Sequence, residues 1–89
     1  MATEGRSGQP RLKDGYTTLI MSSLPGEEDW QIDSFETRPE PSNHARQTMV
    51  IGEALVAIRR EHPTRRYSSP DEAVAFFERE LAARGVRLA

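Results

Sequence analysis

The 89-residue chain has no cysteine, which excludes disulfides, thiolate metal sites and a cysteine nucleophile. Lysine occurs once, at Lys13, and every other basic residue is arginine, a bias that indicates a GC-rich bacterial genome. Apolar runs are short, and none approaches the roughly 20 residues that a membrane-spanning helix needs. Met1 to Pro10 contain no apolar stretch of the kind found in signal peptides, so we expect a cytoplasmic protein without membrane contact.

Charge and length narrow the function classes further. The formal net charge is −2, which argues against a general affinity for nucleic acid or anionic membranes but not against a local basic patch. A chain of 89 residues forms one domain with a small core. Because such a core barely offsets the conformational entropy of folding, we expect self-association, in the simplest case a dimer, or a protein partner.

The first fifteen residues are rich in glycine and charge, with Leu12 as their one large apolar side chain. A segment of this composition buries too little surface to offset its ordering. We therefore predict a flexible N-terminal tail over residues 1–15 and a single α+β domain over residues 16–89.

Residues 16–24 and 30–37 have the composition of β-strands. The first range is rich in β-branched and aromatic residues, and Pro25-Gly26 after it is typical of a turn. In the second range the apolar alternation of Trp30 and Ile32 changes phase at Phe35, which indicates a β-bulge. The two ranges predict an antiparallel β-hairpin.

Residues 43–62 and 70–84 are predicted to form two antiparallel helices packed on that hairpin. In the first, positions 51, 55, 58 and 62 form an apolar stripe that Val50 and Ala54 widen. Gly52 either weakens this helix by about 1 kcal/mol relative to alanine or marks the close approach of another backbone.

The second helix has clear boundary signals. Ser69, Pro70 and Glu72 form a capping box in which the Glu72 carboxylate should reach the amide of the cap residue. Gly85 suits the left-handed position that ends a helix. Phe76 and Phe77 are adjacent and point about 100° apart, so we expect one of them to extend beyond the core toward an interface.

The sequence predicts no catalytic, metal-binding or cofactor-binding residues. His44 and His62 lie at opposite ends of one predicted helix, about 27 Å apart at 1.5 Å per residue. No metal-binding helix motif, nucleophile elbow or glycine-rich phosphate loop is present. We therefore expect a protein that is not an enzyme, with an enzyme whose site lacks a sequence signature as the third alternative.

The strongest functional signal is the contrast between two charged segments. The acidic segment, residues 27–40, carries six carboxylates and one arginine, and is either a solvated face or a docking surface for a basic partner. The basic segment, Arg59–Tyr67, has four arginines and a tyrosine, which can balance the helix dipole, bind an acidic protein or bind nucleic acid.

Segregated opposite charges favour association with a protein or with a second copy of the chain. The expected function is that of a small non-catalytic regulatory or accessory protein that acts by protein–protein binding. The alternative is a DNA- or RNA-binding regulator that uses the basic segment. The predicted partner-binding residues are Arg59, Arg60, Arg65, Arg66, Tyr67 and Phe76.

Overall fold

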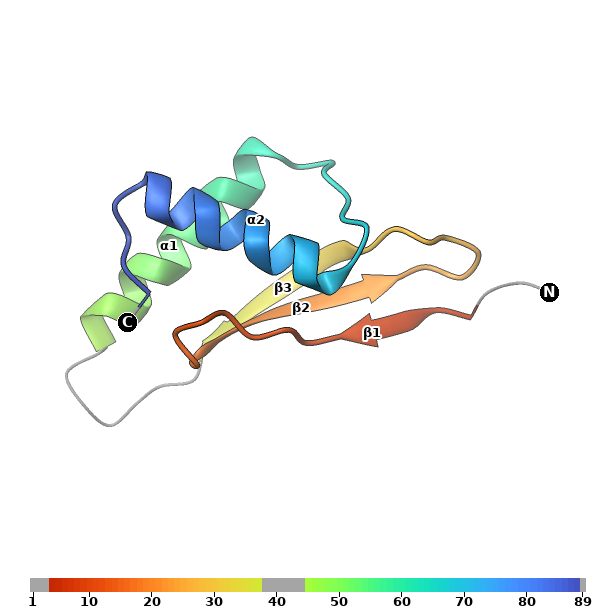
Figure 1. Cartoon of the computed structure of the whole chain (residues 1–89), viewed down its shortest axis with the longest axis horizontal. Coiled ribbons are helices and arrows are strands. Elements are labelled where there is room, and N and C mark those ends of the chain that lie inside the picture. The colour runs from red at the N-terminus through yellow and green to blue at the C-terminus, as the bar shows by residue number, and fades with distance from the viewer. Residues whose placement is uncertain (1–3, 38–44, 89) are drawn as a thin grey trace.

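A computed structural model describes residues 4–37 and 45–88. Three antiparallel strands, β1 (Arg6–Gly8), β2 (Thr17–Ser23) and β3 (Gln31–Thr37), form one sheet in the order β1-β2-β3. Two helices, α1 (Ala45–Glu61) and α2 (Pro70–Ala83), cover one face of this sheet (Figure 1). The predicted α+β class and the hairpin are confirmed, with one additional strand.

The side chains of the central strand β2 alternate between the two faces of the sheet. Thr17, Leu19, Met21 and Ser23 are buried, and the residues between them are only half-buried, as the two-residue period of a strand requires. Leu19 and Met21 join the core beneath the helices.

The predicted bulge lies in β3. Ile20 pairs with Ser34 and Met21 pairs with Ile32, so Asp33 is the extra residue on β3. The insertion shifts the phase by one residue, which lets both Ile32 and Phe35 pack against the core although they lie three positions apart.

The predicted flexible tail is wrong from Arg6 onward. β1 pairs with β2 from Arg6↔Ser23 to Gly8↔Met21, and only 2% of Leu12 is exposed. The buried Asp14 carboxylate accepts hydrogen bonds from the Thr17 amide (3.0 Å) and hydroxyl (2.7 Å). Backbone pairing, one apolar anchor and this local turn therefore hold a segment whose composition alone suggests disorder. Residues 1–3 lie outside the described residues.

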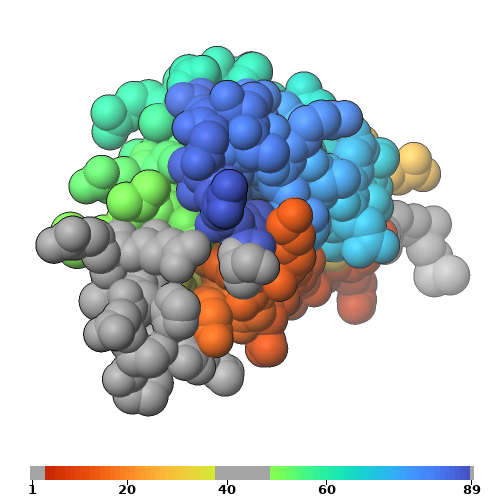
Figure 2. Space-filling view, turned by 60° about the vertical axis from the view of Figure 1, so that its left-hand side comes forward, coloured from red at the N-terminus to blue at the C-terminus, as the bar shows by residue number. Residues whose placement is uncertain are grey.

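The C-terminal residues cover part of the core. Leu88 is buried, and the Glu78 carboxylate of α2 accepts a hydrogen bond from the Lys13 amide at 2.8 Å. Figure 2 shows the C-terminal segment, in dark blue, against the orange segment between β1 and β2. The segment between β1 and β2 is thus held against the C-terminal part of the chain.

Both adjacent phenylalanines of α2 are buried, so the prediction that one of them leaves the core is wrong. The Phe77 ring meets the Phe35 ring of β3 edge-on, with centroids 5.5 Å apart. The Phe76 ring lies 5.3 Å from the His62 ring and 5.7 Å from the Tyr67 ring. The connection between the helices packs over α2 and buries Phe76 from a side that the helix periodicity alone does not indicate.

The boundaries of α2 follow the prediction with one change. The Ser69 hydroxyl accepts a hydrogen bond from the Glu72 amide at 3.1 Å, and Gly85 takes a φ of +76° while the Val86 amide donates to the Leu81 carbonyl. The Glu72 carboxylate, however, accepts from the hydroxyl and amide of Ser68 rather than from the amide of Ser69. These two hydrogen bonds lower the pKa of Glu72.

Candidate interaction groove

Three of the four arginines in the basic segment make contacts within the molecule. Arg59 donates to the carbonyls of Ile32 (3.0 Å) and Asp33 (3.2 Å) on β3. The Arg65 guanidinium lies 4.1 Å from the centre of the Phe76 ring. These contacts tie the C-terminal end of α1 to the sheet and the connection between the helices to α2.

Arg66 joins the two charged segments to each other. Its guanidinium forms an ion pair with the Glu27 carboxylate at 2.8 Å. Part of the charge complementarity that we expected between two molecules is therefore satisfied by an ion pair within one molecule. Arg38 and Glu40 of the acidic segment lie outside the described residues.

Tyr67 is a structural residue of the helix connection. Its backbone exchanges two hydrogen bonds with that of Trp30, at 2.7 and 2.9 Å, and only 3% of the residue is exposed. Burial raises the pKa of the Tyr67 phenol. The ring face that the nucleic-acid hypothesis requires for base stacking is covered by the chain itself, as is Phe76.

Arg59, His62, Arg65 and Arg66 also line a small polar hollow of about 300 Å³. The hollow lies beyond the C-terminal end of α1, where the helix dipole is negative and weakens attraction for anions.

Within the described part of the chain, no cluster of three or more histidine, aspartate or glutamate side chains could hold a metal ion. His44 lies outside the described residues. None of the described helices is long and apolar enough to cross a membrane.

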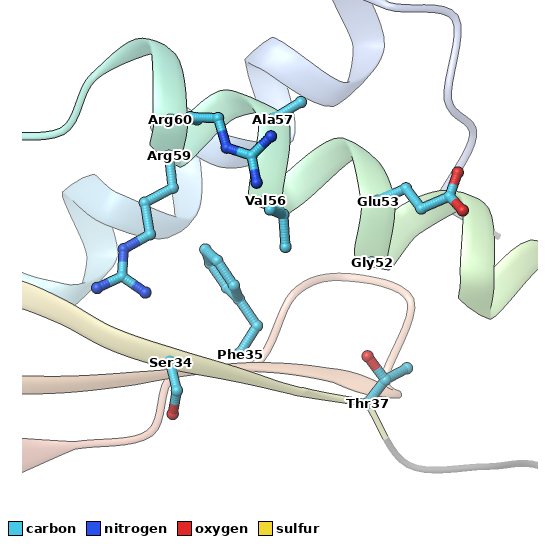
Figure 3. A pocket seen from close by; sticks show the side chains of 9 residues that line it. All are labelled: Ser34, Phe35, Thr37, Gly52, Glu53, Val56, Ala57, Arg59 and Arg60. Carbon is cyan, nitrogen blue, oxygen red and sulfur yellow. The ribbon is translucent and has the colours of Figure 1, made fainter.

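The larger concavity is an open groove of about 700 Å³ between β3 and α1, which we call the β3–α1 groove (Figure 3). The Phe35 ring projects from β3 toward α1, and Val56 projects toward it from the helix. The Arg60 guanidinium overhangs the same space, whereas Glu53 extends away on the other side of Val56. The full lining comprises Ser34, Phe35, Thr37, Gly52, Glu53, Val56, Ala57, Arg59 and Arg60.

Gly52 widens the groove. A Cβ placed on Gly52 would have no atom of another described segment within 4 Å. Among the described residues, the alternative in which this glycine marks a close backbone approach is therefore wrong. The missing side chain leaves space beside Val56.

α1 carries a second stripe on the face opposite its core stripe. Ile51, Leu55 and Ile58 are buried, while positions 49, 53, 56 and 60 repeat the spacing of four, three and four on the outer side. Met49 is 66% exposed and Val56 is 46% exposed. Val50, which we assigned to the core stripe, is also exposed. We call Met49, Glu53, Val56 and Arg60 the outer stripe.

Among the side chains of residues 4–37 and 49–88, the two charged residues of the outer stripe have no partner: neither Glu53 nor Arg60 forms an ion pair or side-chain hydrogen bond there. The neighbouring Glu61, by contrast, pairs with Arg84 of α2. Of the predicted partner-binding residues, Arg59 and Arg60 line the groove, and Arg65, Arg66, Tyr67 and Phe76 do not.

The β3–α1 groove was not predicted from the sequence, because the predicted packing of residues 43–62 rested only on the core stripe. The signal that could have revealed it is the repeated spacing of the outer stripe, which alternates apolar and charged residues. Comparison with known proteins found no matching family model, no matching curated protein and no matching solved structure.

Proposed function

We propose that the chain is a small non-catalytic accessory protein that binds protein through the β3–α1 groove. The observation that carries the proposal is the coincidence of a groove with exposed apolar side chains on one helix. Val56 lines the groove together with Phe35 and is 46% exposed, and Met49, which belongs to the same outer stripe of α1, is 66% exposed. Exposed apolar surface with a polar rim is characteristic of protein-binding sites.

The composition of the groove favours a protein over nucleic acid. Nucleic-acid binding draws its affinity mainly from cations that neutralise phosphates. Here Arg59 is held by β3 carbonyls, and Arg60 shares the groove with the Glu53 carboxylate. Apolar contacts flanked by one charge of each sign suit a protein surface better.

The proposal is tested by placing a charge in the groove. Val56→Asp should abolish capture of protein by the immobilised chain, because a carboxylate would be desolvated against Phe35. Leu24→Asp is the matched control, since Leu24 is 44% exposed against 46% for Val56 and lies in the turn between β2 and β3. Quantitative mass spectrometry of retained proteins compares the wild type with both variants, after denaturation curves show that both are folded.

Capture that survives Val56→Asp unchanged would contradict the proposal. A fluorescent DNA and RNA titration at two salt concentrations tests the rival function. Tight wild-type binding that weakens steeply with salt would favour the nucleic-acid alternative, because phosphate contacts release counterions.

A further inference from the structure

We propose that the occupant of the β3–α1 groove is α1 of a second copy of the chain, packed antiparallel across a two-fold axis near Val56. This inference rests on the proposed function and names its partner. Its basis is the order of residues in the outer stripe, in which Glu53 and Arg60 lie on either side of Val56.

An antiparallel two-fold makes this stripe complementary to itself. Glu53 and Arg60 are seven residues apart, about 10 Å along the helix axis at 1.5 Å per residue. The midpoint between them falls between Val56 and Ala57. A two-fold axis at that midpoint places Glu53 of each copy opposite Arg60 of the other, so that one symmetric contact forms two ion pairs.

The opposite arrangement is unfavourable. A parallel two-fold would place Glu53 against Glu53 and Arg60 against Arg60, and like charges in direct apposition disfavour a complex. The absence of partners for both side chains within the described residues leaves their charges available to a second copy. The order of Glu53 and Arg60 along α1 therefore favours a second copy of α1 as the occupant, and the antiparallel orientation for that copy.

The surface is large enough for such a contact. A standard protein interface covers about 800 Å² on each partner, roughly an eighth of the 6004 Å² that this chain exposes. The 17 residues of α1 extend about 25 Å, and the groove beside them adds Phe35 and Thr37 of β3. The exposed Met49 and Val56 supply the apolar surface that the contact would cover.

The test uses charge reversal in the full-length chain, followed by sedimentation velocity over a range of concentrations. Glu53→Arg and Arg60→Glu should each weaken self-association by at least about tenfold, because every dimer then contains two like-charge contacts in place of two ion pairs. The double variant Glu53→Arg/Arg60→Glu should restore wild-type association. An equimolar mixture of the two single variants should also associate, since one copy then presents two arginines and the other two glutamates.

A matched control is Arg79→Glu, which makes the same substitution at an exposed position of α2 and should leave association unchanged. Restoration in the double variant cannot come from contacts within α1, because residues seven apart on a helix are two turns away from each other. Urea denaturation of each variant checks that it remains folded.

The outcomes separate this inference from the proposed function. A monomeric wild type, or single variants that associate like the wild type, overturns the inference. If a monomeric wild type still captures another protein in a Val56-dependent manner, the groove binds a different partner and the proposed function stands. If capture is also independent of Val56, both proposals fail.

Discussion

Replacing Leu12 by alanine tests whether the N-terminal segment belongs to the fold. Leu12 is 2% exposed and belongs to the same core cluster as Leu19, Phe77 and Leu88. Truncation of a buried leucine to alanine costs about 2–5 kcal/mol, from lost apolar burial and the remaining cavity. A domain of this size has a free energy of unfolding of roughly 5–15 kcal/mol, so the substitution should remove a large share of it.

The measurement is urea denaturation followed by fluorescence of Trp30, the single tryptophan, which is buried in the same core. In a thermal melt followed by the same fluorescence, a loss near 3 kcal/mol should lower the melting temperature by roughly 12–24 °C at 4–8 °C per kcal/mol. Lys13→Ala is the control, because the Lys13 side chain is exposed and only its backbone amide bonds to Glu78. Equal denaturation midpoints for Leu12→Ala and the wild type would refute the structured N-terminal segment and restore the flexible tail.

Two further substitutions test arginines of the basic segment. Arg59→Ala should cost about 1–2 kcal/mol because it removes two hydrogen bonds to β3 carbonyls, whereas Arg66→Ala should cost less than about 1 kcal/mol because its ion pair with Glu27 is exposed. Equal urea midpoints for the two variants would contradict this ranking. Because burial raises the pKa of Tyr67 above 10.0, its stabilising contribution is complete below pH 10 and should fall as pH rises through the raised value. The slope of stability between about pH 9 and pH 11 should therefore flatten in Tyr67→Phe, and a slope equal to that of the wild type would contradict the effect.

The features predicted best are those whose cause lies within a few residues. The N-cap at Ser69 and the terminal Gly85 of α2 depend on hydrogen bonds that span three to five positions, so the sequence displays all their partners. The bulge at Asp33 belongs to the same class, because the change of apolar phase is visible within β3 itself. The one local error, the Glu72 contact with Ser68, is a displacement by a single residue.

The features missed depend on contacts between distant segments. β1 has no apolar alternation, and its strand exists because β2 offers an edge some fifteen residues along the chain. Phe76 is buried because the backbone of Tyr67 bridges to Trp30 and brings the helix connection over α2. Helix or strand periodicity identifies neither β2 as the partner of β1 nor the helix connection as the segment that covers Phe76.

The basic segment shows the same limit at the level of the site. Four arginines that are neighbours in sequence point to different parts of the molecule: Arg59 to the edge of β3, Arg65 to an aromatic ring, Arg66 to the turn before β3 and Arg60 to the groove. On a helix and the loop that follows it, contiguous charges diverge, so a run of one charge does not define one surface. The sequence therefore indicates where the arginines lie along the chain but not which part of the molecule each of them faces.

The division of α1 into two stripes links the stability of the domain to its proposed association. The core stripe consists of large branched apolar residues that cannot remain exposed to water, and the sheet and α2 cover them. The outer stripe alternates Met49 and Val56 with Glu53 and Arg60. An isolated chain tolerates such a mixed surface because the charges keep it hydrated, yet an antiparallel copy can neutralise both charges and cover both apolar side chains at once. A helix with this composition on its outer face is suited to an association that forms and dissociates, rather than to a permanently buried interface.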